Sequence, residues 1–115
     1  MGNQKKTQIL ESCLGKSQSL ASLVEYATDS IVSKTILDKS TGTLTLFAFG
    51  AGQNLSEHTS PYDATIQVLD GQAEVIIDGQ AIAVSCGHLI VMPANIPHSV
   101  HAREPFKMLL IMIRE

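Results

Sequence analysis

Short runs of β-branched and apolar residues, broken by turn residues, follow one another from Leu20 to the end of the chain. This close alternation is typical of an all-β sandwich or barrel, and no long helix fits between the runs. We expect the strands to lie at the runs themselves, which are residues 20–26, 31–37, 43–49, 65–69, 73–77, 81–84, 88–92, 98–102 and 106–113.

Two Asp-Gly pairs mark the middle of this pattern. Asp70-Gly71 and Asp78-Gly79 each stand between apolar runs. Two-residue hairpin turns need positive φ at both central residues, and Asp-Gly meets that need well. The sequence therefore predicts a meander of hairpins over residues 65–84.

The chain has 115 residues, 44% of them hydrophobic, which is enough for one domain with its own core. Residues 1–20 are polar and rich in Ser and Gln, with a weak apolar spacing at Ile9, Leu10 and Leu14 before Gly15. We expect an N-terminal arm over residues 1–20, either a short helix or disordered, and a barrel domain over residues 21–115.

Charge and hydropathy exclude several classes of partner. The net charge is −3, and Lys5-Lys6 is the only basic cluster, so no footprint for a nucleic-acid backbone exists. The longest apolar run, residues 108–113, is far shorter than a membrane helix, and the first ten residues lack a signal-peptide core. We expect a cytoplasmic protein with no membrane partner.

The last apolar run indicates how the barrel is covered. Residues 108–113 are apolar at every position, and Leu44, Leu46 and Ala48 alternate with a second partly apolar set in the 43–49 run. An antiparallel strand with one wet face would not show this pattern. We expect one face to line the barrel and the other to meet a second sheet or a second subunit, and a homodimer is the simplest explanation.

Two spaced motifs add a family resemblance. Gly52, His58 and Gly71 match the pattern G-x5-H-x-H-x3,4-E-x6-G at the correct spacing, and a second pattern, G-x5-P-x-G-x2-H-x3-N, is matched by Gly87, Pro93 and His98. The chain thereby resembles small single-domain members of the cupin superfamily. The resemblance implies a single cupin barrel, that is, a double-stranded β-helix of antiparallel jelly-roll type.

The departures from these motifs bear on the site. Ser60, Ala64, Asn95 and Ala102 replace the second histidine, the glutamate, the second glycine and the final asparagine. Of the four positions that bind metal in cupin enzymes, only two histidines remain. A stable zinc or iron site takes at least three protein ligands, so a third ligand would be required.

Asp63 and His101 are the nearest candidates for that third ligand. Strand alternation turns His101 away from the cavity. Asp63 is harder to place, because Pro61 interrupts the alternation. If Asp63 turns inward, His58, His98 and Asp63 form a facial set for a divalent metal such as Zn, Fe, Ni or Mn.

Without metal, the same residues would line a pocket. Ser60 shares the inward face with His58, and Met92 is placed to touch the cavity, so the predicted ligand-binding residues are His58, Ser60, His98 and Met92. The leading interpretation is a small cupin that binds a small molecule in the barrel, with or without a divalent metal. The alternative is a metal-dependent cupin enzyme of dioxygenase or isomerase type using His58 and His98. The sequence leaves enzyme status open.

Overall fold

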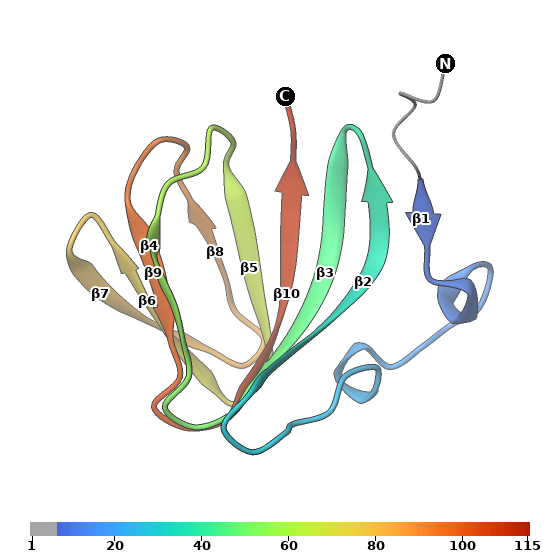
Figure 1. Ribbon diagram of the computed structural model, residues 1–115, viewed down its shortest axis with the longest axis horizontal. Coiled ribbons are helices and arrows are strands. Elements are labelled where there is room, and N and C mark those ends of the chain that lie inside the picture. The colour runs from blue at the N-terminus through green and yellow to red at the C-terminus, as the bar shows by residue number, and fades with distance from the viewer. Residues whose placement is uncertain (1–6) are drawn as a thin grey trace.

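The computed structural model describes residues 7–115 (Figure 1). Strands make up most of this part of the chain, and two three-residue 3₁₀ turns precede them. The elements are β1 (Gln8–Ile9), η1 (Glu11–Cys13), η2 (Leu20–Ser22), β2 (Ile31–Lys39), β3 (Gly42–Phe49), β4 (Asn54–His58), β5 (Ala64–Asp70), β6 (Gln72–Ile77), β7 (Gln80–Ser85), β8 (Leu89–Met92), β9 (His98–His101) and β10 (Phe106–Ile113).

The strands form two antiparallel sheets that face each other. One has six strands in the order β1-β2-β3-β10-β5-β8, and the other has four in the order β4-β9-β6-β7. Neighbours in each sheet are mostly distant in sequence, as in a jelly roll, and in Figure 1 the strands converge at one end and fan apart at the other. The predicted all-β architecture of antiparallel strands is confirmed.

The two Asp-Gly pairs have different roles. Ile77 pairs with Gln80, and Asp78 and Gly79 both have positive φ (50° and 80°), so a two-residue hairpin joins β6 to β7 as predicted. Gly71 alone has positive φ in the other pair, and β5 and β6 belong to different sheets. The predicted meander over residues 65–84 is therefore wrong at its first turn, which is a corner between sheets.

The N-terminal segment contains neither the predicted short helix nor the predicted strand at 20–26. Backbone bonds from Cys13 to Leu10 and from Leu14 to Glu11 span three residues, so the turn at η1 is 3₁₀, and η2 is also a single 3₁₀ turn. The apolar spacing here is weak and good helix formers are few, so no helix longer than a single 3₁₀ turn forms. Residues 1–6, where the arm begins, lie outside the described residues.

Two side-chain hydrogen bonds, one from each partner, hold the end of this segment on the six-stranded sheet. The Tyr26 hydroxyl donates to Asp70 Oδ2 at 2.5 Å. Lys107 Nζ donates to the Ala21 carbonyl at 2.6 Å and lies 4.9 Å from the centre of the Tyr26 ring. Burial, followed by the bond to Asp70, raises the pKa of Tyr26 well above its ordinary value. Tyr26 therefore remains protonated and able to donate.

Both faces of the six-stranded sheet are apolar, as the sequence predicts. The inner face joins the four-stranded sheet in a core that contains Phe49 and Phe106, whose rings stack with centroids 4.5 Å apart. On the outer face, Leu46, Ala48 and Leu109 pack under Val24 in a second cluster. Part of the outer face is thus covered by the chain's own segment after η2, which the sequence did not reveal.

A β-bulge sets the register between β4 and β9. Leu55 pairs with Val100 and His58 pairs with His98, so three steps along β4 match two along β9. An extra residue in one strand shifts every later side chain to the other face. Leu55 and His58 are an odd number of residues apart, so in a regular strand their side chains would point to opposite faces. Because of the bulge, both stand opposite residues that share one face of β9, namely Val100 and His98.

Candidate functional site

The structure brings His58 and His98 into contact. His58 ends β4, His98 begins β9, and the two are cross-strand partners. Their Nε2 atoms lie 3.2 Å apart, and their rings meet edge to face with centroids 4.4 Å apart and planes at 75°. His98 is only 2% exposed, whereas His58 is exposed to solvent. A ligand or ion can therefore approach a buried imidazole from the side of an accessible one.

Backbone carbonyls fix the orientation of both rings. His58 Nδ1 lies 2.7 Å from the Ser56 oxygen, and His98 Nδ1 lies 3.1 Å from the Ile96 oxygen. A carbonyl oxygen can only accept, so each Nδ1 carries the hydrogen and donates it. In the neutral rings both Nε2 atoms then carry lone pairs, and these meet at 3.2 Å. A cation or a hydrogen-bond donor between or beside the two atoms would stabilise this arrangement.

Burial disfavours the protonated form of His98. Desolvation, followed by the nearby His58, lowers the pKa of His98 below its ordinary value, and the bond to Ile96 opposes this only in part. His98 is therefore neutral at pH 7. A neutral imidazole with a free Nε2 is the form that binds metal ions or accepts a hydrogen bond.

The other predicted pocket residues lie in or beside the neighbouring loops. Ser60 is buried, and its hydroxyl accepts from the Tyr62 amide at 3.1 Å while its carbonyl accepts from the Asn95 amide at 2.7 Å. The Asp63 carboxylate accepts from the Ala94 amide at 2.8 Å. These bonds tie the loop after β4 to the loop after β8.

Asp63 is not grouped with the two histidines. Within residues 7–115 no cluster of three or more His, Cys, Asp or Glu side chains is arranged to hold a metal ion. Met92 is 3% exposed and belongs to the inner core, opposite Ala64 on β5. The structure thus brings together the two histidines of the predicted set, while the binding roles of Ser60, Asp63 and Met92 stay predictions.

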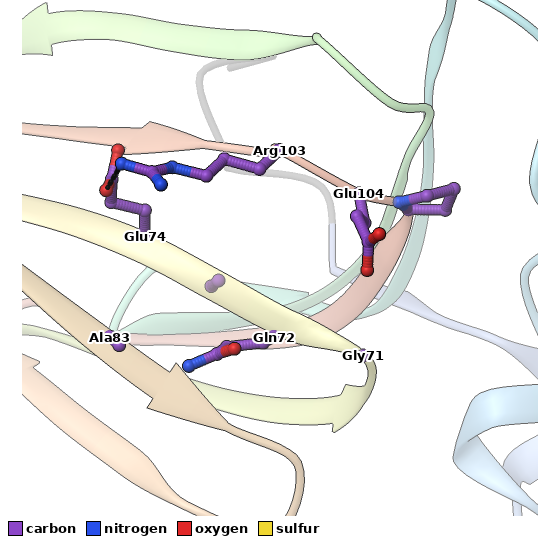
Figure 2. Close-up of a pocket in the computed structure, with 8 residues that line it drawn as sticks. Gly71, Gln72, Glu74, Ala83, Arg103 and Glu104 are labelled. Atoms are coloured by element: carbon purple, nitrogen blue, oxygen red, sulfur yellow. Dashed lines mark hydrogen bonds and ion pairs between the residues drawn. The ribbon is translucent and has the colours of Figure 1, made fainter.

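A groove of about 390 Å³ lies elsewhere on the molecule (Figure 2). Its lining includes Gln72, Glu74 and Arg103. The groove lies at the end of β6 that begins with Gln72, whereas Ile77, the partner of His98, lies at the other end of that strand. The Arg103 guanidinium already pairs with Glu74 at 2.9 Å. This groove is therefore separate from the histidine pair, and we base the candidate site on the convergent imidazoles.

Sequence reasoning missed a second polar pair on β9. Ser99 is buried, and its Oγ lies 3.0 Å from His101 Nε2. The alternation that turned His101 away from the cavity would also have placed Ser99 beside it. β9 itself is paired with β4 and β6 on its two sides. We interpret the pair as a satisfied polar contact.

Comparison with known proteins fits this geometry. The family model for the Cupin domain matches residues 45–113, which include both histidines and the strands that carry them. The chain belongs to the cupin family. No curated protein matches it.

Several solved structures share the fold. A conserved protein of unknown function from Streptococcus pyogenes is 33% identical, with a TM-score of 0.87, over 99% of this chain and 98% of that one. A cupin superfamily protein from Desulfitobacterium hafniense is 27% identical, with a TM-score of 0.83, over 87% and 92%. A Cupin 2 conserved barrel domain protein from Leptotrichia buccalis is 42% identical, with a TM-score of 0.79, over 82% of this chain but 46% of its own.

The cupin motifs explain one departure in this chain. Asn95 stands where the second motif has glycine, and its φ is 65°. Asparagine tolerates the left-handed region better than other residues with a side chain. The backbone turn of the motif is therefore kept, and the replacement leaves the presentation of His98 intact.

No helix within residues 7–115 is long and apolar enough to cross a membrane.

Proposed function

We propose that this cupin binds a small molecule at the His58/His98 pair, together with a divalent transition metal ion held by both Nε2 atoms. The observation that carries the proposal is the meeting of the two Nε2 atoms at 3.2 Å, while each Nδ1 faces a backbone carbonyl. Metal–imidazole bonds are about 2.0–2.1 Å long, so two nitrogens closer than about 4 Å can share one ion. The donor set therefore fits a borderline metal such as Zn²⁺, Co²⁺ or Ni²⁺.

Two imidazoles leave most of the coordination positions of such an ion to other ligands. A structural zinc site is closed by four protein ligands, and a catalytic one keeps three. We infer that binding of the ion alone is weak, and that a small molecule with two neighbouring oxygen donors strengthens it. When bound, the ion would supply Lewis acidity to that molecule, while the protein holds both imidazoles in one tautomer through Ser56 and Ile96.

Titration calorimetry with Co²⁺ and Zn²⁺ tests the proposal, with oxalate as the probe for a chelating oxygen ligand. We expect one ion per chain and tighter binding when oxalate is present. His58→Ala and His98→Ala should each weaken binding by more than about a hundredfold, since loss of an outer-shell partner alone costs about 10–100-fold. His88→Ala, in an exposed turn, is the matched control and should bind as the wild type does.

A further variant decides the role of Asp63. Asp63→Asn keeps an oxygen for the Ala94 amide but removes the carboxylate charge. Unchanged affinity is expected from the present geometry, and a large loss would establish a two-histidine, one-carboxylate set instead. If neither metal binds saturably, or if the His58→Ala/His98→Ala double variant binds as the wild type does, the proposal is wrong.

A further inference from the structure

The groove in Figure 2 lies on the outer face of the four-stranded sheet. Val75 of β6 is buried in the core between the sheets, so Gln72 and Glu74 point the other way, outward. By the same alternation Ile77, the partner of His98, lies on the inner side with Val75. The groove and the histidine pair therefore occupy opposite faces of one sheet, and each would bind its own ligand.

Small residues leave the space that forms the groove. Ala83 on β7 is exposed and pairs with Glu74, so its short side chain stands beside Glu74 on the outer face. Gly71, at the corner between the sheets, has no side chain, and a Cβ there would lie 2.5 Å from the Pro105 carbonyl oxygen. The corner thus requires glycine at a position that lines the groove.

Residues 103–105 form the opposite wall, and the chain holds them at both ends. Before them, the Ala102 carbonyl accepts from the Gly52 amide at 2.7 Å, and the Ala102 amide donates to the Gln53 carbonyl at 3.0 Å. After them, Phe106 is fully buried. The ring of Pro105 also fixes its own φ. The wall is therefore formed in advance, and a ligand would have little of the chain to order.

The lining carries one guanidinium and two carboxylates. Arg103 is 82% exposed and donates to Glu74 at 2.9 Å, an exposed ion pair of the weak kind. A guanidinium has five N–H donors, so Arg103 can also bind a second group. Glu104 is exposed and makes no hydrogen bond or ion pair with any of residues 7–115. In Figure 2 Arg103 extends toward Glu74, and Glu104 stands apart from this pair.

These groups suit a ligand that carries both charges. Arg103 can donate to a carboxylate, while Glu104 and the Gln72 amide oxygen can accept from an ammonium group. An anion alone would meet two carboxylates, and a cation alone would leave the remaining donors of Arg103 unused. The volume of about 390 Å³ lies within the range of small-molecule pockets, roughly 300–1,000 Å³.

We propose that the groove binds a small zwitterion of the amino-carboxylate class, with its carboxylate on Arg103 and its ammonium group on Glu104. The site is independent of any ion or ligand at the histidine pair, because the two lie on opposite faces of the sheet.

Titrations followed by ¹H–¹⁵N correlation NMR test the site with β-alanine, 4-aminobutyrate and 6-aminohexanoate, in which the two charges lie progressively farther apart. We expect saturable shifts of the amides of Gln72, Ala83, Arg103 and Glu104 with at least one of these ω-amino acids. Acetate and methylammonium, which carry one charge each, should bind at least about tenfold more weakly, since each loses a charged hydrogen bond.

Three substitutions in the lining should each weaken binding of the best ω-amino acid by at least about tenfold. Arg103→Gln and Glu104→Gln each remove one charge, and Ala83→Leu fills the groove without changing the charge. Lys34→Gln and Glu11→Gln remove the same charges from exposed sites outside the groove and should bind as the wild type does. The correlation spectrum of each variant also shows whether it is folded.

A separate variant checks that the groove acts without the histidine pair. His58→Ala/His98→Ala should bind the ω-amino acid as the wild type does, whatever becomes of its metal binding. The proposal is wrong if none of the three ω-amino acids gives saturable shifts, if acetate or methylammonium binds as tightly as they do, or if folded Arg103→Gln keeps the wild-type affinity.

Discussion

Replacement of Gly71 by alanine should destabilise the fold far more than the same change at Gly79. Both glycines have positive φ, 73° and 80°, which costs a residue with a side chain about 1–2 kcal/mol. They differ in their surroundings, because a Cβ on Gly71 would lie 2.5 Å from the Pro105 carbonyl oxygen, whereas a Cβ on Gly79 would meet nothing within 4 Å. The clash is with backbone and cannot be relieved by a rotamer change, so we add about 1–3 kcal/mol of overpacking at Gly71 alone.

Urea denaturation followed by far-UV circular dichroism measures this difference, since the chain has no tryptophan for fluorescence. We expect Gly79→Ala to lose about 1–2 kcal/mol of unfolding free energy and Gly71→Ala about 2–5 kcal/mol. The gap of 1–3 kcal/mol corresponds to at least about 4 °C in Tm for a domain of this size. Equal losses for the two variants would show that the corner between the sheets yields freely, and would refute the reasoning.

Two further predictions concern titration and the N-terminal segment. Because the pKa of His98 is lower in the folded state than the value of about 6.5 in the unfolded state, the unfolded chain binds more protons below pH 6.5, and stability should fall as the pH drops through that value. Urea titrations in EDTA from pH 8 to pH 5 should show this fall, and His98→Gln should flatten it; an identical slope in His98→Gln would contradict the assignment. Tyr26→Phe removes the bond to Asp70 and should cost about 1 kcal/mol, while Tyr62→Phe, for comparison, should cost less in the same assay. Equal stability of Tyr26→Phe and the wild type would mean that the bond from Tyr26 to Asp70 does not help to hold the segment.

The sequence predicted the backbone correctly where the conformation depends on neighbouring residues alone. Asp78 and Gly79 gave the hairpin between β6 and β7, because both residues must adopt positive φ and nothing else competes. The same dipeptide at 70–71 was misread. There the chain leaves one sheet for the other, and a corner needs only Gly71 to have positive φ. Which of the two occurs depends on long-range pairing that a dipeptide does not encode.

The candidate site was predicted only in part for a similar reason. Motif spacing identified His58 and His98, and the structure places them in contact. Strand alternation alone could not have predicted this contact, since the bulge between Leu55 and His58 leaves no clear mark in the sequence. Asp63 was proposed as a ligand because it is close in sequence, but its carboxylate bonds to the Ala94 amide across the loop. Loop hydrogen bonds of this kind depend on tertiary contacts.

The extra residue in β4 also decides which side chain meets His98. In an uninterrupted ladder that begins at Leu55 and Val100, the residue opposite His98 would be Glu57. The bulge moves His58 into that place, so the same residues paired without it would set a carboxylate against the imidazole of His98. The imidazole pair therefore depends on a backbone irregularity as much as on the two histidines themselves.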